Sequence, residues 1–500
     1  MRRLLPGLTL ALLTACYGLP DPPPPTNPIR ILLVNDVYVL DTLTDGLGGL
    51  HRVAGLRSRL DDEGPTLFVL AGDVLSPSLL SKYFHGRQMV QGFNAAGLDY
   101  ATFGNHEFEL DRDTLVARVA ESEFVWLSAN CVEASGAPFP GVRAWDTVRM
   151  NGRLVGIFGS TMQGDYRRYV RCGDPDSAAT RAVAALDSAG AELILAVTHQ
   201  DADADLALLA REPRIDMVLG GHEHEAHTLR VGERHLLKAD ANSRSAQFAT
   251  VWGDTAAWRQ AVTLVRIDAR TPPDTATARI VAAWGDSLRG RLGAERVIGT
   301  TSVPIDARDA PLRREERPLG NLVTDAMRAG TGADVALINA GTLRLDDVIA
   351  EGPVTSYQLE SMFLFPDETR VLTFPVTGAR LREILEHGVS ERNLGAGGFL
   401  QVSGVRFRYD PQRPTGERIT GPLVRPDGTT FGTNESLRLA FPVYPACEGG
   451  DGYQVPEAAE ACAEWRSGPR TVDLLTGYIA DSLGGRVVLP ETGRIEAVGG

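Results

Sequence analysis

Side chains that can bind metal ions follow five short apolar runs of the sequence. The runs span residues 29–34, 67–71, 100–103, 193–198 and 215–219, and just beyond their ends lie Asp36, Asp73, Asn105, His199, His222 and His224. Each residue alone has a local explanation, because Asp and Asn commonly stabilise turns. Their shared position, after the carboxyl end of a strand, is where open α/β sheets build binding sites. We therefore expect all six to meet at one sheet edge.

These six side chains form a mixed set of oxygen and nitrogen donors. Carboxylate with imidazole suits zinc, manganese, iron or cobalt, whereas magnesium and calcium prefer oxygen alone. Six donors exceed one open tetrahedral site but fit two metal ions that share a carboxylate. A two-metal site of this kind generates hydroxide and clamps an in-line phosphoryl displacement.

The five runs do not alternate between apolar and polar residues, which is typical of strands covered on both faces. Helical patterns lie between several of them, at 48–60, 88–96, 111–122, 177–189 and 203–211. This alternation predicts a layered α/β domain.

Length and composition narrow the class of protein. A chain of 500 residues exceeds what one hydrophobic core usually covers, so two or three domains are expected. With 43% hydrophobic and 23% charged residues, a largely disordered chain, a fibre and a polytopic membrane protein are excluded. A formal charge of −14 repels polyanions, so duplex nucleic acid is not expected as a partner, and no protein partner is predicted.

The N-terminus has the features of an export signal. Arg2 and Arg3 precede an apolar stretch at 4–13, too short to span a bilayer, which ends in Leu-Thr-Ala-Cys. That ending resembles a lipobox, in which Cys16 is lipidated; a plain signal peptide is the alternative. We predict a lipoprotein signal at 1–16, a proline-rich tether at 17–28, and an exported protein whose only membrane contact is the lipid anchor at the cell envelope.

Four further cysteines, Cys131, Cys172, Cys447 and Cys462, suit an oxidising compartment. Three pairings are possible, and proximity in the sequence favours 131–172 and 447–462. No spacing among them is typical of a zinc site.

Longer motifs add a family resemblance. The segments NDVY (35–38), GD (72–73), GNHEFE (104–109) and GGHEH (220–224), with His199, resemble the metallophosphoesterase core in the order found in the 5′-nucleotidase family. In the second half, ERPLGNL (316–322), NAGTLR (339–344), GGFLQV (397–402) and GGDGY (449–453) resemble that family's C-terminal domain. The match extends from about residue 29 to about residue 485.

The resemblance implies an α/β fold with two domains. A layered metallophosphoesterase domain, with two sheets flanked by helices, is expected over 29–268. A connecting segment at 269–296 contains a predicted helix at 275–292, which would act as a hinge. A second, α+β nucleotide-binding domain is expected over 297–490.

Site roles also follow from the resemblance. Asp36, Asp73 and His224 would hold the first metal ion, and Asp73 would bridge to a second held by Asn105, His199 and His222. His106 would protonate the leaving oxygen or stabilise the transition state, with Glu109 as its partner. The residues expected to hold the nucleotide are Arg313, Asn339, Arg344, Phe365, Tyr444 and Asp451.

Three residues depart from the family pattern. Tyr38 stands where the family usually has a histidine ligand; it is either a spectator, or a phenolate ligand that would favour ferric iron. Glu109 replaces the usual Asp, for which we expect a looser contact with His106 and reduced turnover. The second base-stacking aromatic aligns with Pro445, so either the neighbouring Tyr444 stacks or the clamp is one-sided.

The predicted function is that of a metal-dependent phosphoric ester hydrolase with two divalent transition metal ions, zinc, manganese or cobalt. It would release phosphate from nucleoside 5′-phosphates by attack of metal-bound hydroxide, for extracytoplasmic nucleotide scavenging. UDP-sugars and nucleoside di- and triphosphates are further candidate substrates. The alternatives are a 2′,3′-cyclic nucleotide phosphodiesterase with 3′-nucleotidase activity, a thiosulfohydrolase relative, and a non-catalytic nucleotide-binding lipoprotein.

Overall fold

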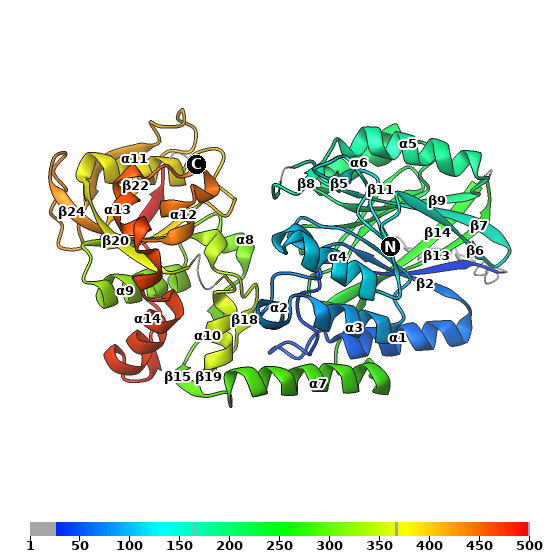
Figure 1. Cartoon of the computed structure of the whole chain (residues 1–500), viewed down its shortest axis with the longest axis horizontal. Helices are drawn as coiled ribbons and strands as arrows, with labels where there is room; N and C mark the ends of the chain where they lie inside the picture. Colours follow the sequence, from blue (N-terminus) through cyan, green and yellow to red (C-terminus); the bar gives the residue numbers. More distant parts are fainter. Residues whose placement is uncertain (1–26, 165, 256, 366–368, 499–500) are drawn as a thin grey trace, which may run out of the picture.

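The computed structural model describes residues 27–498 except 165, 256 and 366–368, and shows two bodies side by side (Figure 1). The predicted signal at 1–16 and most of the predicted tether lie outside the described residues. Among the residues described, no helix is both long enough and apolar enough to cross a membrane.

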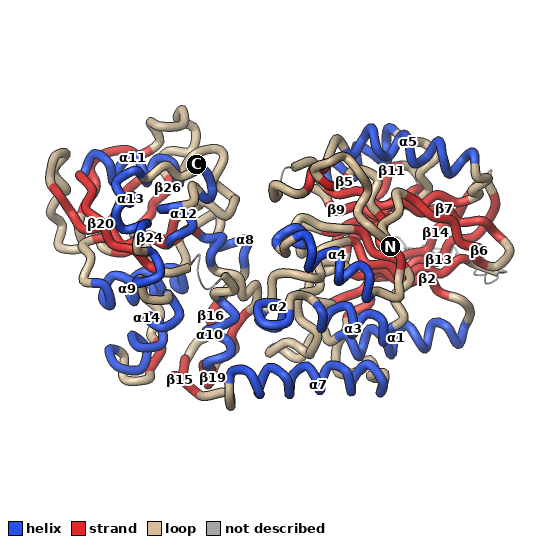
Figure 2. Tube along the Cα trace, viewed as in Figure 1, coloured by secondary structure: helices blue, strands red, loops and turns tan. Residues whose placement is uncertain are grey.

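Two six-stranded sheets form the centre of the first body (Figure 2). The first sheet has the order β14 (Ala257–Arg266), β13 (Ser245–Asp254), β1 (Ile29–Val34), β2 (Thr66–Ala71), β3 (Tyr100–Thr102) and β4 (Val125–Leu127). The second has the order β11 (His227–Val231), β12 (Arg234–Lys238), β10 (Met217–Gly221), β9 (Leu193–His199), β7 (Arg153–Thr161) and β6 (Trp145–Met150). Within them, β1 to β4 are parallel, as are β7, β9, β10 and β12.

The sheets face one another and helices cover their outer faces. Ile31, Leu67 and Leu195 belong to the apolar layer between the sheets. Helices α1 (Leu50–Glu63), α3 (Arg87–Ala96), α4 (Arg112–Glu121) and α7 (Thr275–Leu292) cover the first sheet, and α5 (Pro175–Ser188) and α6 (Ala202–Arg211) cover the second. The layered α/β prediction is therefore confirmed. One detail was wrong: the five predicted strands end at two facing edges, one in each sheet, and not at one edge.

Helix α7 runs along the first body toward the second (Figure 1). The Asp274 side chain caps it by accepting a hydrogen bond from the backbone N–H of Thr277. Its far end joins an apolar contact between the bodies, formed with α2 (Leu79–Phe84) and α10 (Ser356–Met362). Beside this contact, Lys82 on α2 donates to Glu360 on α10 at 2.8 Å.

The second body has its own apolar core around the sheet β20 (Val371–Thr377), β24 (Ser436–Pro442), β17 (Val335–Asn339) and β21 (Leu400–Ser403). Its longer helices are α9 (Pro318–Thr331), α11 (Gly378–Gly388) and α14 (Thr471–Gly477). Shorter elements include α8 (Asp309–Leu312), α12 (Val443–Cys447), α13 (Ala459–Ala463), β15 (Val297–Thr301), β16 (Ile305–Asp306), β18 (Val348–Ile349), β19 (Gly352–Thr355), β22 (Arg406–Tyr409), β23 (Ile419–Val424), β25 (Arg486–Val487) and β26 (Ile495–Ala497).

Both predicted disulfides are present. Cys131–Cys172 joins the paired strands β5 (Cys131–Glu133) and β8 (Val170–Cys172), and both cysteines pack into the apolar cluster of the first sheet and its helices. Cys447–Cys462 links the end of α12 to α13 in the second body, and so closes the loop that carries Asp451.

Candidate metal centre and substrate cleft

The loops after β1 and β2 hold Asp36 and Asp73 in tight, unusual backbone geometry. Both residues have left-handed backbones, with φ of 53° and 56°, which points both carboxylates inward. Gly104 allows this approach, because a Cβ there would lie 2.1 Å from Asp73 Oδ1. Gly221 allows the second sheet to come close to the end of β2, since a Cβ at this position would lie 2.3 Å from the Ala71 carbonyl oxygen.

The two carboxylates lie against imidazoles from the second sheet. Asp73 Oδ2 is 3.1 Å from His199 Nε2, and Asp36 Oδ1 is 3.4 Å from His224 Nε2. One donor atom each from Asp36, Asp73 and His199 lie within 4.8 Å of one another. All three side chains are almost completely buried.

The other two predicted ligands border the same place. Asn105 comes three residues after the end of β3, and its Oδ1 is buried with no hydrogen-bond partner among the described residues. The His222 ring lies edge-on to the His199 ring, with centroids 5.3 Å apart, and its backbone N–H donates to Asp36. The six predicted ligands therefore converge, although their roles as ligands stay a prediction.

Electrostatics at this place favour cations. Burial disfavours the charged form of His199, yet the carboxylates of Asp73 and Asp36 raise its pKa to about 10. Burial likewise opposes ionisation of Asp36, but His199 and His224 hold the pKa of its carboxyl below the usual value. Two buried carboxylates thus share one small volume and draw positive charge to it, as the raised pKa of His199 shows.

The donor set fits a pair of metal ions on its own chemistry. It combines carboxylate, amide and imidazole groups, and the unpartnered Asn105 Oδ1 is an acceptor that protein donors leave unsatisfied. The His199 Nδ1 lies 2.8 Å from the Ala71 carbonyl, which leaves Nε2 directed at the carboxylates. Such second contacts are what orient an imidazole ligand.

The Tyr38 hydroxyl lies among the donor atoms of the predicted ligands. Its hydroxyl oxygen is 3.1 Å from Asp73 Oδ2, 3.4 Å from Asp36 Oδ1 and 3.1 Å from His224 Nε2. Burial, together with the Asp73 and Asp36 carboxylates, raises the pKa of Tyr38 well above its usual value.

His106 projects into the cleft from the turn after β3 and is held by Glu109. Glu109 Oε1 lies 2.7 Å from His106 Nδ1, and Glu109 Oε2 accepts from the Ser76 hydroxyl at 2.8 Å. The expectation of a loose contact was therefore wrong: Ser76 anchors the longer carboxylate at its second oxygen. Burial disfavours a charged His106, but Glu109 and Asp73 raise its pKa.

Glu107, in the same motif, has a structural task that the sequence analysis did not assign. Its buried carboxylate accepts four backbone N–H groups, at 2.6–3.0 Å, from the loops after β2 and β3: those of Asp73, Val74, Leu75 and Gly104. It therefore fixes the loops that carry Asp73 and Asn105. The sequence feature that could have revealed this task is an acidic residue within the motif, between His106 and Glu109.

Lys238 fixes the loops of the second sheet and was also missed. Its buried ammonium group donates to the carbonyls of Gln200 and Gly221, at 2.6 and 2.8 Å. It also pairs with Glu223 at 2.5 Å and with Asp205 at 2.9 Å. One side chain thus ties the loop after His199 to the loop that contains His222 and His224. The signal was its rarity, since only Lys82 and Lys238 are lysines among 50 basic residues.

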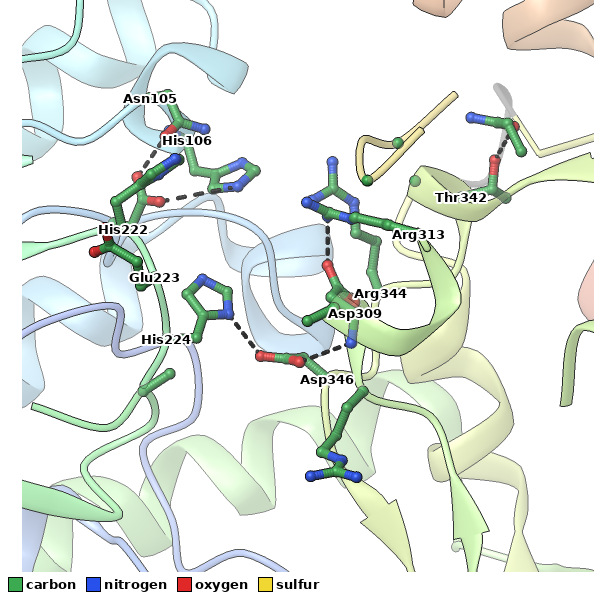
Figure 3. A pocket seen from close by; sticks show the side chains of 18 of the residues that line it. Asn105, His106, His222, Glu223, His224, Asp309, Arg313, Thr342, Arg344 and Asp346 are labelled. Atoms are coloured by element: carbon green, nitrogen blue, oxygen red, sulfur yellow. Dashed lines mark hydrogen bonds and ion pairs between the residues drawn. The ribbon is translucent and has the colours of Figure 1, made fainter. Parts of the chain in front are cut away.

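A cleft of about 1860 Å³ lies over this centre, between the two bodies (Figure 3). From the first body it is lined by Asp73, Asn105, His106, Glu109, His222 and His224. From the second body it is lined by all six predicted substrate residues, Arg313, Asn339, Arg344, Phe365, Tyr444 and Asp451. The structure therefore brings the two predicted sets to one cavity.

The second body's side of the cleft is ordered by contacts among these residues. Asn339 Nδ2 donates to Asp451 Oδ2 at 2.8 Å, and Asn339 Oδ1 accepts from the Thr342 hydroxyl. The Arg344 guanidinium lies 5.9 Å from the centre of the Phe365 ring. Tyr444 lines the cleft whereas Pro445 is buried outside it, so Tyr444 is the aromatic available to stack.

Comparison with protein families agrees with this architecture. The calcineurin-like phosphoesterase model matches residues 29–226, and the model of the 5′-nucleotidase C-terminal domain matches residues 297–458. Fold and site thus define the first body as a metallophosphoesterase, the domain of metal-dependent phosphoric ester hydrolases. With both domains in this order, the chain belongs to the 5′-nucleotidase family.

Individual relatives are distant. The chain is 24% identical to the trifunctional nucleotide phosphoesterase protein YfkN of Bacillus subtilis strain 168, matching 87% of this chain and 33% of YfkN. It therefore spans about a third of that relative. It is 25% identical to an apyrase of Tabanus yao, over 94% of each chain. The crystal structure of a 5′-nucleotidase precursor from Thermus thermophilus has the same fold, with a TM-score of 0.80, 23% identity, and coverage of 95% of this chain and all of that one.

We expect Glu109→Asp to lower kcat, because the shorter side chain cannot reach both His106 and Ser76. Misplacing an oriented catalytic group by about 1 Å costs on the order of 10²-fold in rate. Phosphate-release kinetics measure the effect, with the exposed Glu121→Asp as control. A kcat for Glu109→Asp at or above that of the wild type contradicts the tight arrangement.

We expect Lys238→Met to lower the free energy of unfolding by about 3–5 kcal/mol, because it leaves buried carboxylates unpaired. Metal content should fall as well, since the loops of His199 and His222 lose their common anchor. Urea unfolding and elemental analysis after gel filtration measure both. Lys82 is the chain's other lysine and does not contact the metal-binding loops, so Lys82→Met should keep full metal content. Equal metal content in the two variants would refute the role of Lys238 in holding these loops.

Proposed function

We propose that the protein releases phosphate from nucleoside 5′-monophosphates in the cleft between its two domains. The observation that carries this proposal is that one cavity is lined by four of the six predicted metal ligands and His106 on one side, and by all six predicted nucleotide contacts on the other. The coarser class, a metal-dependent nucleotide phosphohydrolase, follows from the family.

The residues of the first domain supply the phosphoryl chemistry. Asp36, Asp73 and His224 would hold one metal ion, and Asn105, His199 and His222 would hold a second one bridged by Asp73. When bound, such a pair supplies a nucleophile at neutral pH and neutralises charge on the transferring phosphoryl group. His106 delivers a proton to the leaving oxygen, and Glu109 fixes its ring through Nδ1.

The residues of the second domain recognise the nucleoside. Phe365 and Tyr444 offer aromatic faces for a base, and Arg344 offers fixed donors to anionic or hydroxyl oxygens. Asp451, held by Asn339, is an acceptor for ribose hydroxyls. Burial raises the pKa of the Asp451 carboxyl, against the opposing effect of the hydrogen bond from Asn339.

Retention of these nucleoside contacts favours nucleotides over thiosulfonates, and retention of His106 with all six ligands favours catalysis over binding alone. UDP-sugars and nucleoside di- and triphosphates are further candidate substrates, and 2′,3′-cyclic phosphodiesterase activity is the second candidate function.

We also propose that the protein is exported and lipid-anchored through Cys16. Its two disulfides support an oxidising compartment.

For the metals, we propose two transition ions, with Tyr38 as a ligand of the first. Donor atoms that share one ion at bond lengths of about 2.0–2.2 Å lie roughly 3.0–3.5 Å apart. The Tyr38 hydroxyl has that spacing to three of the predicted donors. This favours the ligand interpretation over the spectator one, and a phenolate oxygen is a hard donor that suits ferric iron in the first position.

We expect purified protein from residue 17 onward to release phosphate from AMP, to lose this activity in EDTA, and to regain it with Mn²⁺, Zn²⁺ or Co²⁺. UDP-glucose, ATP and 2′,3′-cyclic AMP complete the panel and separate the candidate substrates. His106→Ala should abolish hydrolysis while nucleotide binding remains. Hydrolysis of the cyclic substrate alone would favour the second function, and bound metal without any hydrolysis would refute the proposal.

We expect the iron-loaded protein to show a visible phenolate-to-iron charge-transfer band that Tyr38→Phe abolishes, because only a ligating phenolate gives this transition. Absorption spectra of the two proteins, reconstituted with ferrous iron and oxidised in air, are the measurement. The buried Tyr100, whose hydroxyl donates to Asp146 and to none of the predicted ligands, provides a control as Tyr100→Phe. If the iron-loaded wild-type protein lacks the band, Tyr38 is not a metal ligand and is a spectator.

A further inference from the structure

We infer that Asp346 is a positioning residue that orients the predicted metal ligand His224 from the opposite domain. This inference rests on the proposed function, because it concerns the same metal centre. It adds a residue that lies outside every motif of the sequence analysis.

The contact is short and well supported. Asp346 Oδ2 lies 2.7 Å from His224 Nδ1, as the dashed line in Figure 3 marks. Its other oxygen, Oδ1, accepts the backbone N–H of Asp309 at 2.9 Å. Asp346 has a left-handed backbone, with φ of 46°. The Asp346 carboxylate is therefore held in place by its own domain, independently of its contact with the imidazole.

This bond decides which imidazole nitrogen faces the metal centre. An ionised carboxylate at Nδ1 requires the proton there, so a metal ion can bind this imidazole only at Nε2. Nε2 is the nitrogen directed at Asp36 Oδ1, 3.4 Å away. Carboxylate partners of this kind fix the tautomer and the orientation of a histidine ligand and raise its basicity.

The contact crosses the boundary between the domains. His224 belongs to the loop after β10, whereas Asp346 belongs to the segment between β17 and β18. Two residues earlier, Arg344 lies 3.8 Å from Glu109, the carboxylate that holds His106. One short segment of the second domain therefore reaches a metal ligand and the partner of the proton donor. A movement that separated the two domains would break both contacts together.

The neighbouring Asp347 offers a matched comparison. It also bonds across the domain boundary, pairing with Arg244 at 2.5 Å, and this partner is not one of the predicted metal ligands. Replacing either residue removes one carboxylate from the domain boundary. Only replacement of Asp346 removes the support of His224.

The test measures binding of Zn²⁺ alone to the metal-stripped protein by calorimetry, for wild type, Asp346→Ala, Asp346→Asn and Asp347→Ala. We expect Asp346→Ala to weaken one of the two sites by about 10- to 100-fold, as loss of such partners does elsewhere. Asp346→Asn keeps an acceptor for Nδ1–H and should recover part of the affinity. Asp347→Ala should match the wild type.

Wild-type affinity in Asp346→Ala, or the same loss in Asp347→Ala, would overturn the inference, the second result by showing that any weakened domain contact has this effect. Thermal unfolding of each variant confirms that it is folded. Because no nucleotide is present, the result does not depend on which substrate the protein hydrolyses. In kinetics, Asp346→Ala should lower kcat more than it changes KM, since Asp346 supports the metal centre and not the nucleoside.

Discussion

The rest of the structure depends on one constraint: two carboxylates must stay ionised although they are buried. Asp36 and Asp73 are buried and share one small volume with His199. Fixed donors offset part of the desolvation: the His222 N–H serves Asp36, and the His106 N–H serves Asp73. Metal ions bound here would contribute further positive charge to the same two carboxylates. The metal ions are thus expected to stabilise the fold as well as to serve the reaction.

Irregular loops can hold such a site only if they are anchored elsewhere, and the anchors are single buried charges. Glu107 collects N–H groups from two loops of the first sheet, and Lys238 collects carbonyls from two loops of the second. In a chain whose basic residues are otherwise arginines, both lysines, Lys82 and Lys238, have buried side chains bonded to carbonyl as well as carboxylate oxygens. A compact ammonium group can turn its three donors in different directions, whereas the five donors of a guanidinium lie in one plane.

Periodicity and local signals predicted much of the fold. The helix at 275–292 and the strand at 29–34 have the predicted bounds, because a capping Asp and a continuous apolar run are local features. That the strands belong to two facing sheets was not predictable from these runs, since strand pairing is set by contacts distant in the sequence. The predicted ligands converged because each follows a strand. Asp346 and Lys238 could not be found this way, because their partners come from another domain or another strand.

The segment from Asn339 to Asp346 shows why the two domains form one site. It begins at the end of β17, where Asn339 holds Asp451, passes Arg344 beside Glu109, and ends with Asp346 on His224. The predicted nucleoside contacts, the partner of His106 and the predicted metal ligand His224 are therefore linked through eight consecutive residues. Residues within one contact network have coupled effects on free energy. If the proposed roles hold, a nucleoside that moved this segment would also act on the predicted metal centre, so substrate choice and catalytic geometry would depend on the same loop.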